Sequence, residues 1–478
     1  MSGEFGKKAV KGAFWASVDK VSSMVIQFAV NLILARLLLP DDFGAIGLLT
    51  IFIVVSGTLV DGGFASALIQ KKDATQTDFS TVFFWNLGLS TFLYVILFVA
   101  APWIADFYHI PLLCNILRVL GLSLIINAFR LIPINKLTKE LAFKKLALIH
   151  LTTYIASAAL AIYMAYRGAG AWSLVAFTLA QGGLSGILFW LFSDWRPTLE
   201  FSWPSFKRLF SFGGYILAAN VLQQISQNVQ GLIIGRKFSS TQMGYYSQAQ
   251  KLDSVFSYSV PQVIVSVMYP VYSQIQDDLE RLRSVLAMNL RVISYLIFPM
   301  LALLAFMAEP LITGLYGDKW LPSVPYFRIF CVGGIFVCLQ NLNFYAVASV
   351  GKSRQLFLWS LYKWSCLLAF LLIGMQFGMY GILWGVVLSQ FNIFCVNAWL
   401  ASRHVGLTVV AQLLIVLRAA LFVALCLLPA LVVCVCFDWH LFVGGSIFIL
   451  IYLIVSYTFK LRSFTETIDI LNKFIHRK

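Results

Sequence analysis

Charged side chains are scarce in this sequence: of its 478 residues, 12% are Asp, Glu, Lys or Arg, and 60% are hydrophobic. Soluble domains carry about 25% charged residues, so this composition and a mean hydropathy of +0.85 exclude an ordinary soluble protein. The longest polar connections, 194–207 and 276–291, are too short for a catalytic domain. We therefore expect an integral membrane protein that is not an enzyme.

Patterns that bind metals or nucleotides are also lacking. The eight cysteines include no Cys-x-x-Cys pair, and the five histidines have no metal-ligand spacing. The segment "AVASVGKS", which ends at Ser353, differs from a phosphate-binding loop at one residue, because Ala346 stands in place of its first glycine. It follows an apolar run, whereas a phosphate-binding loop follows a strand. We expect no metal site and no cofactor.

Apolar runs of about 20 residues, the length of a membrane-spanning helix, recur along the whole chain. We predict about 14 spans, at 14–38, 44–69, 81–102, 112–133, 147–166, 171–192, 212–235, 249–272, 291–308, 326–349, 356–374, 380–401, 411–436 and 441–458. The predicted fold is therefore an all-α integral membrane protein. It consists of two sets of six spans and a C-terminal helix pair.

The two sets of six spans have related sequences at an offset of two hundred residues. The segment "QFAVNLILARLLLPDDFGAIG" aligns without a gap with "QNVQGLIIGRKFSSTQMGYYS". The matching polar and glycine positions are Gln27 and Gln227, Arg36 and Arg236, and Gly44 and Gly244. Such matches are informative because an unneeded polar group is rarely kept in lipid. Sequence repeats of this kind are typical of secondary transporters.

The repeat defines the expected domains. We predict an N-lobe at 1–200, a C-lobe at 201–405, two additional spans at 406–459 and a basic tail at 460–478. Because each lobe has an even number of spans, the repeats are parallel. The tail fits either an amphipathic helix on anionic lipid or a frayed basic end.

The net charge of +15 does not indicate nucleic-acid binding, because the basic residues occupy alternate loops. These loops contain Lys7, Lys8, Lys71, Lys72, Lys136, Lys139, Lys207, Arg208, Arg281 and Arg283. Cytoplasmic loops of membrane proteins are enriched in Lys and Arg. The pattern predicts that both termini are cytoplasmic.

Polar side chains within the predicted spans are the candidate functional residues, because each ionisable group at mid-bilayer costs about 2.5–3.5 kcal/mol. They are Asp19, Lys20, Gln27 and Asn31 in the first span, Asp61 in the second, Asn220, Gln223 and Gln227 in the seventh, and Lys251, Asp253 and Tyr258 in the eighth. Lys20, Gln27 and Asn31 recur at helical spacing and so share a face, as do the three amides of the seventh span. They form either polar contacts between helices or the wall of a water-filled cavity. The run of amides favours the cavity.

Four segments resemble a known family. They are "ILARLLLPDDFGAIGLL", "DGGFASALIQKK", "YPVYSQIQDDLERLR" and "ITGLYGDKW". Together they are similar to the Wzx-type flippases of the multidrug/oligosaccharidyl-lipid/polysaccharide exporter superfamily, in the subgroup of colanic-acid and teichuronic-acid exporters. The resemblance covers nearly the whole chain. It implies two lobes around a central cavity lined by spans one, two, seven and eight.

The resemblance also implies a function. The expected cargo is an undecaprenyl-pyrophosphate-linked oligosaccharide, flipped to the outer leaflet of a bacterial plasma membrane for exopolysaccharide, O-antigen or capsule synthesis. A polysaccharide polymerase and chain-length proteins of the same pathway are the implied partners, besides membrane lipid.

The candidate residues suit the chemistry of this cargo. Amides such as Gln27, Asn31, Asn220, Gln223 and Gln227 suit the glycan. The pyrophosphate requires fixed cations, for which the candidates are Lys20 and Lys251, with Arg36 and Arg236 nearer the outer end. Tyr258 shares a face with Lys251. Asp19, Asp61 and Asp253 are candidates for coupling to H+ or Na+, or for counter-charges to the lysines, which we favour for Asp19 and Asp253.

Two alternative functions remain. A drug/cation antiporter of the same superfamily requires acids and aromatics in its cavity, whereas these candidates are mainly cations and amides. A membrane-embedded polysaccharide polymerase or glycosyltransferase normally has a sizeable outer loop or an acidic catalytic motif, and neither is seen in the sequence.

Overall fold

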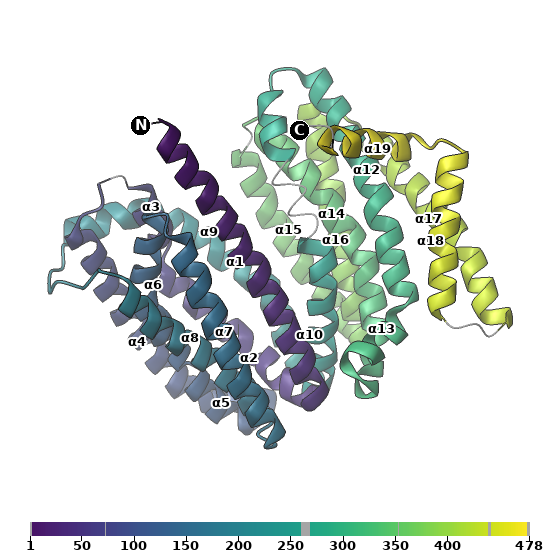
Figure 1. Ribbon diagram of the computed structural model, residues 1–478. Helices are drawn as coiled ribbons and strands as arrows, with labels where there is room; N and C mark the ends of the chain where they lie inside the picture. Colours follow the sequence, from purple (N-terminus) through teal and green to yellow (C-terminus); the bar gives the residue numbers. More distant parts are fainter. Residues whose placement is uncertain (1, 72, 260–267, 352, 438–440, 476–478) are drawn as a thin grey trace. The chain divides into compact units, whose positions relative to one another are not determined.

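A computed structural model describes residues 2–71, 73–259, 268–351, 353–437 and 441–475, and within these ranges the chain is helical without a β-strand (Figure 1). Eleven helical segments of the described chain are long and apolar enough to cross a membrane. One of them, Leu358–Val405, includes most of α15 (Ser353–Gly374) and all of α16 (Gly378–Val405). The all-α membrane fold is therefore confirmed.

Two predicted spans are absent from the eleven apolar segments. The seventh corresponds to α9 (Trp203–Lys237), and the eighth begins in α10 (Ser240–Ser254). Helix α9 contains too many polar residues to be among them, and the 15 residues of α10 are too few. The eighth predicted span also includes residues 260–267, which lie outside the described ranges. The number of fourteen spans stays a prediction.

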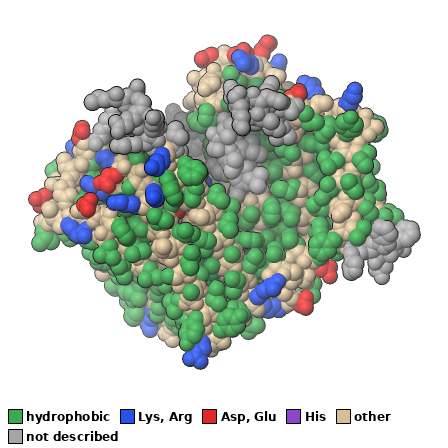
Figure 2. All heavy atoms as spheres, in the orientation of Figure 1, with side chains coloured by type: hydrophobic (Ala, Val, Ile, Leu, Met, Phe, Trp, Pro, Cys, Tyr) green, Lys and Arg blue, Asp and Glu red, His purple; other side chains and the backbone are tan. Residues whose placement is uncertain are grey.

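Residues up to Gly244 form the first of two compact units. Besides α9, its helices are α1 (Ser2–Leu37), α2 (Pro40–Asp61), α3 (Phe64–Gln70), α4 (Gln76–Tyr108), α5 (Leu112–Leu120), α6 (Leu122–Lys139), α7 (Phe143–Tyr166) and α8 (Trp172–Phe192). Helix α1 packs chiefly on α7, and α9 packs chiefly on α2. A buried cluster that includes Phe64, Phe83 and Phe206 joins α3, α4 and the start of α9. On the visible face of these helices, hydrophobic side chains cover the middle and charged ones lie mostly toward the ends (Figure 2).

The second unit contains the rest of the chain from Tyr245. After α10 and a π-helical turn, η1 (Val255–Ser259), its helices are α12 (Leu279–Phe306), α13 (Ala308–Tyr316), α14 (Val324–Ser349), α15, α16, α17 (Val409–Phe437), α18 (Leu441–Thr458) and α19 (Arg462–Ile475). Helix α14 packs on α12 and α16, and α17 packs on α12 and α18. The strongly amphipathic α19 packs on α12. The tail therefore begins with an amphipathic helix, one of its two predicted forms.

The first turns of α2 and α10 meet in a reciprocal contact. A Cβ added at Gly44 would lie 1.8 Å from the carbonyl oxygen of Ser240, and one added at Gly244 would lie 2.0 Å from that of Pro40. Ser240 Oγ donates a hydrogen bond to Asp41 Oδ1 at 2.6 Å. The two glycines that match across the repeat thus have matching roles, because each allows its own helix to approach the carbonyl of the other.

Candidate functional site

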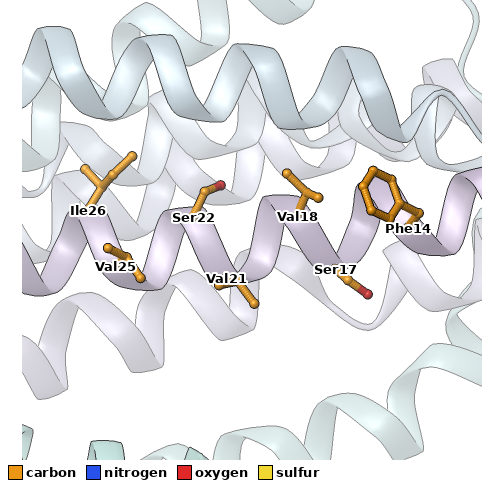
Figure 3. Close-up of a pocket in the computed structure, with 7 residues that line it drawn as sticks. All are labelled: Phe14, Ser17, Val18, Val21, Ser22, Val25 and Ile26. Carbon is orange, nitrogen blue, oxygen red and sulfur yellow. The ribbon is translucent and has the colours of Figure 1, made fainter.

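Three of the candidate residues of α1, namely Lys20, Gln27 and Asn31, share one side of the helix. Lys20 and Gln27 are exposed, and Asn31 is half-buried. A shallow apolar groove of about 490 Å³ runs along another side of the helix (Figure 3). Its lining consists of Phe14, Ser17, Val18, Val21, Ser22, Val25 and Ile26. At 100° per residue, most of these positions lie away from Lys20 and Gln27. Helix α1 therefore presents a polar and an apolar side.

Polar contacts tie α1 to α7. His150 Nδ1 lies 3.0 Å from both carboxylate oxygens of Asp19, and Ser23 Oγ lies 3.4 Å from one of them. Farther along α1, Gln27 Nε2 donates a hydrogen bond to Tyr154 Oη at 2.5 Å. His150 and Tyr154 were not among the sequence candidates. They are polar groups four residues apart in a predicted span, which is the signal that identified the other candidates.

Arg130, a cation of the first unit, was also not among the sequence candidates. Arg130 lies in α6, half-buried, and its Nη1 donates a hydrogen bond to Ser185 Oγ of α8 at 3.0 Å. The first unit thus contains two separate polar contacts between helices, one of a carboxylate with an imidazole and one of a guanidinium with a hydroxyl. Arg130 lies at the end of the predicted span 112–133, where a snorkelling side chain is the usual expectation.

Asp61 is the last residue of α2 and is half-buried. It precedes Gly62 and Gly63, which have φ of 58° and 71°, in the left-handed region that favours glycine. A Cβ added at Gly63 would lie 2.4 Å from the carbonyl oxygen of Gly213 in α9. This double glycine ends α2 and lets the chain pass close to α9.

The amide stripe of α9 lies mostly on the surface of the described structure. Gln223 and Gln227 are exposed, and Asn220 is half-buried. Gln230 is buried, and its Oε1 has no hydrogen-bond partner among the described residues. The stripe thus passes from exposed amides to a buried one that packs within the unit.

The two matching arginines lie at the ends of their helices. Arg36 is exposed in the last turn of α1, and Arg236 is exposed in the last turn of α9. Arg236 Nη1 lies 3.0 Å from the carbonyl oxygen of Phe107 and 2.8 Å from His109 Nε2. Arg236 is therefore bound to the end of α4.

The candidates of α10 and η1 belong to the second unit. The side chain of Lys251 is exposed, whereas Asp253 is 5% exposed and accepts a hydrogen bond of 2.6 Å from Ser257 Oγ. Residues two positions apart on a helix do not face each other. Asp253 lies against α14 at Gly334, where an added Cβ would meet Ser257 Oγ at 2.0 Å. Tyr258 is 47% exposed.

The structure therefore groups the candidates by unit. The first unit contains Asp19, Lys20, Gln27, Asn31, Arg36, Asp61, Asn220, Gln223, Gln227 and Arg236, and the second contains Lys251, Asp253 and Tyr258. Among the described residues, no group of three or more His, Cys, Asp or Glu side chains is placed to hold a metal ion.

The chain matches the family described as "Polysaccharide biosynthesis protein" over residues 33–325. It is 25% identical to the teichuronic acid biosynthesis protein TuaB of Bacillus subtilis, over 74% of each chain. It is also 25% identical to the lipopolysaccharide biosynthesis protein WzxC of Escherichia coli, over 80% of this chain and 79% of that one. It is also 25% identical to the succinoglycan biosynthesis transport protein ExoT of Rhizobium meliloti, over 75% of this chain and 72% of that one.

Two solved structures have the same fold. The first is the lipid II flippase MurJ in an inward closed conformation, with a TM-score of 0.72, 15% identity, and coverage of 93% of this chain and 98% of that one. The second is an inward-facing multidrug resistance transporter of the MATE family, with a TM-score of 0.63 and 15% identity. This match covers 82% of this chain and 98% of that one. The chain belongs to the polysaccharide biosynthesis family of Wzx-type flippases, within the multidrug/oligosaccharidyl-lipid/polysaccharide exporter superfamily.

Proposed function

We propose that this protein flips undecaprenyl-pyrophosphate-linked oligosaccharide units across the bacterial plasma membrane for the synthesis of a cell-surface polysaccharide. The observation that carries this proposal is α9. At 35 residues it is long enough to cross a bilayer, yet it is less apolar than the eleven apolar segments because it carries a row of amides, two of them exposed. Polar groups of this kind within membrane helices normally face a watery pathway.

In the proposed topology, fourteen helices form two parallel six-helix repeats around a central cavity, with both termini in the cytoplasm. The proposed lobes are residues 1–200 and 201–405, followed by two additional spans at 406–459 and the tail at 460–478. The reciprocal contact at Gly44 and Gly244 supports the repeat, because equivalent residues make equivalent contacts.

Each part of the cargo has a proposed partner. The glycan contacts the amides of α1 and α9, which are Gln27, Asn31, Asn220, Gln223 and Gln227. Lys20 and Lys251 bind the pyrophosphate, since both are lysines with exposed side chains. Arg36 and Arg236 bind it nearer the outer face, and Tyr258 contributes to the cavity wall. The polyprenyl chain lies along the apolar groove of α1.

Transport requires an energy source, and we propose that it is coupled to H+ or Na+. The carboxylate of Asp19 contacts His150, so a proton bound at this pair would alter the link between α1 and α7. Asp61 and Asp253 are the remaining coupling candidates. The burial of Asp253 beside Ser257 argues against a simple counter-charge to the exposed Lys251.

A drug/cation antiporter is the second candidate, supported by the fold shared with a multidrug transporter. The cations of the site, to which the structure adds Arg130, favour an anionic cargo instead. A polymerase or glycosyltransferase is disfavoured by the relatives, one of which is named as a transport protein.

The function is tested by deleting the gene and measuring which lipid-linked saccharide accumulates in the inner leaflet. We expect one undecaprenyl-pyrophosphate oligosaccharide to accumulate there, protected from a membrane-impermeant glycosidase added to intact spheroplasts. Re-expression of the wild-type chain should make this pool accessible. An unchanged pool after deletion, or accumulation only of sugar nucleotides, would contradict the proposed cargo.

A further inference from the structure

A cleft of about 390 Å³ lies within the second unit and is lined by none of the residues assigned to the proposed transport site. It is formed by α12, α17, α18 and the start of the amphipathic α19, which in Figure 1 lies across the end of α12. Its lining consists of Arg291, Tyr295, Ile415, Arg418, Ala419, Phe422, Tyr452, Leu461, Arg462 and Ser463. The cleft thus combines three arginines with an aromatic wall.

Two of the arginines are held by one carboxylate. Arg291 Nη2 and Nε lie 2.5 and 3.0 Å from the two oxygens of Glu466, and Arg462 Nε lies 3.1 Å from one of them. The side chain of Arg291 is 19% exposed, whereas that of Arg462 is 77% exposed. Glu466 therefore anchors α19 to α12 and compensates only one of the two positive charges.

The third arginine has no acidic partner among the described residues. Arg418 lies in the third turn of α17, within a segment apolar enough to span a membrane, and its side chain is exposed. An arginine in such a position is costly unless it reaches an anion or the membrane surface. With Glu466 included, the cleft carries a net charge of +2, from three arginines and one carboxylate.

The surroundings of the cleft are those of a lipid site. The exposed side chains of α17 next to Arg418 are Leu414, Leu417 and Leu421, and those of α18 near Tyr452 are Leu450, Leu453 and Ile454. The aromatic wall is ordered, because Tyr452 Oη donates a hydrogen bond of 2.7 Å to the carbonyl oxygen of Tyr295. The Tyr452 ring also lies 5.1 Å from those of Tyr295 and Phe422. A soluble anion would use the arginines but leave this apolar surface uncovered.

We propose that this cleft binds the phosphate headgroup of an anionic glycerophospholipid, with its acyl chains along α17 and α18. Arg418 and Arg462 contact the phosphate, since guanidinium groups bind phosphate bidentately. Arg291 is paired with Glu466 and adds to the positive charge of the cleft. Helix α19 covers the headgroup. This site gives α17, α18 and α19 a role in anchoring the protein in anionic lipid, which is independent of the transported cargo.

The experiment is native mass spectrometry of the full chain in detergent with phosphatidylglycerol or phosphatidylcholine. We expect one phosphatidylglycerol to bind about tenfold more tightly than phosphatidylcholine, because both lipids carry the phosphate but the choline cation of phosphatidylcholine is repelled by the net charge of +2. Arg418→Gln and Arg462→Gln should each remove most of this preference. Arg462 is largely exposed, so its substitution leaves a folded protein even if Arg418→Gln does not fold.

Arg328→Gln is the matched control. Arg328 is an exposed arginine of α14 in the same unit, and its Nε donates to the carbonyl oxygen of Ala305. It does not line the cleft. The control should keep the lipid preference. Equal binding of the two lipids, or equal losses in Arg328→Gln and Arg462→Gln, would overturn the proposal. Displacement of the lipid by millimolar inorganic phosphate would assign the cleft to a soluble anion instead.

Discussion

Replacing Gly44 or Gly244 with alanine is expected to destabilise the protein by about 3 kcal/mol, the upper end for overpacking a tight contact. The new Cβ would lie 1.8 Å from the Ser240 oxygen or 2.0 Å from the Pro40 oxygen. Both oxygens belong to the backbone of a helical first turn, so they cannot move aside by a change of rotamer. The turns of α2 and α10 would have to separate, weakening the hydrogen bond from Ser240 Oγ to Asp41.

The measurement is the midpoint of thermal unfolding in detergent, together with the amount of protein in the membrane. Gly88→Ala is the control, because a Cβ added there, in α4, meets no heavy atom of the described residues within 4 Å beyond its own stretch of helix backbone. Alanine at that position should be neutral or slightly stabilising through its higher helix propensity. If Gly44→Ala and Gly244→Ala unfold at the wild-type temperature, the close approach of these two turns is wrong.

A second large loss of stability is expected from Asp78→Asn. Asp78 lies in the first turn of α4 with its side chain fully buried, and it forms an ion pair with Lys71. Its other oxygen lies 3.3 Å from Arg208 Nη2 of α9. The carboxylate also accepts hydrogen bonds from Thr75 N at 2.9 Å and Thr75 Oγ1 at 3.0 Å. One carboxylate thus caps α4 and connects it with the residues after α3 and with α9.

The Asp78→Asn substitution should lower the free energy of unfolding by about 3 kcal/mol, the lower end of the range for breaking a buried ion pair. The lower end applies because the side chains of Lys71 and Arg208 are 22% and 63% exposed and can be rehydrated. Glu140→Gln is the control, since Glu140 pairs with Lys136 at 3.9 Å on the surface. Surface pairs contribute about 0–1 kcal/mol. Equal unfolding midpoints for the two variants would show that Asp78 does not hold these helices together.

The all-α membrane fold can be predicted from this sequence because hydropathy and helical spacing are local properties. The offset of two hundred residues also identifies Gly44 and Gly244. Only the structure shows why glycine is needed at each, because the obstacle is a carbonyl of the other repeat. The amphipathic pattern after Lys460 likewise predicts α19 but leaves a frayed end as an alternative.

Partners across the fold could not be predicted. His150 lies 131 residues from Asp19, and Glu466 lies 175 residues from Arg291, so no spacing rule connects them. The sequence therefore favours Lys20 as the partner of Asp19, whereas the Asp19 carboxylate contacts the imidazole of His150. Asp78 resembles an ordinary acidic residue at a helix start, and its burial depends on α9 packing over it.

The most direct test is transport of a fluorescent undecaprenyl-pyrophosphate oligosaccharide by purified protein in proteoliposomes. We expect the wild type to expose this lipid at the opposite leaflet faster than protein-free vesicles do. The double variant Lys20→Ala with Lys251→Ala should lose at least about tenfold in rate, as the loss of charge-assisted contacts to the pyrophosphate implies. Lys145→Ala, at an exposed lysine of α7, should retain the wild-type rate. Wild-type protein that moves no cargo, or a double variant as fast as the wild type at equal protein density, would contradict a positively charged pathway for a lipid-linked sugar.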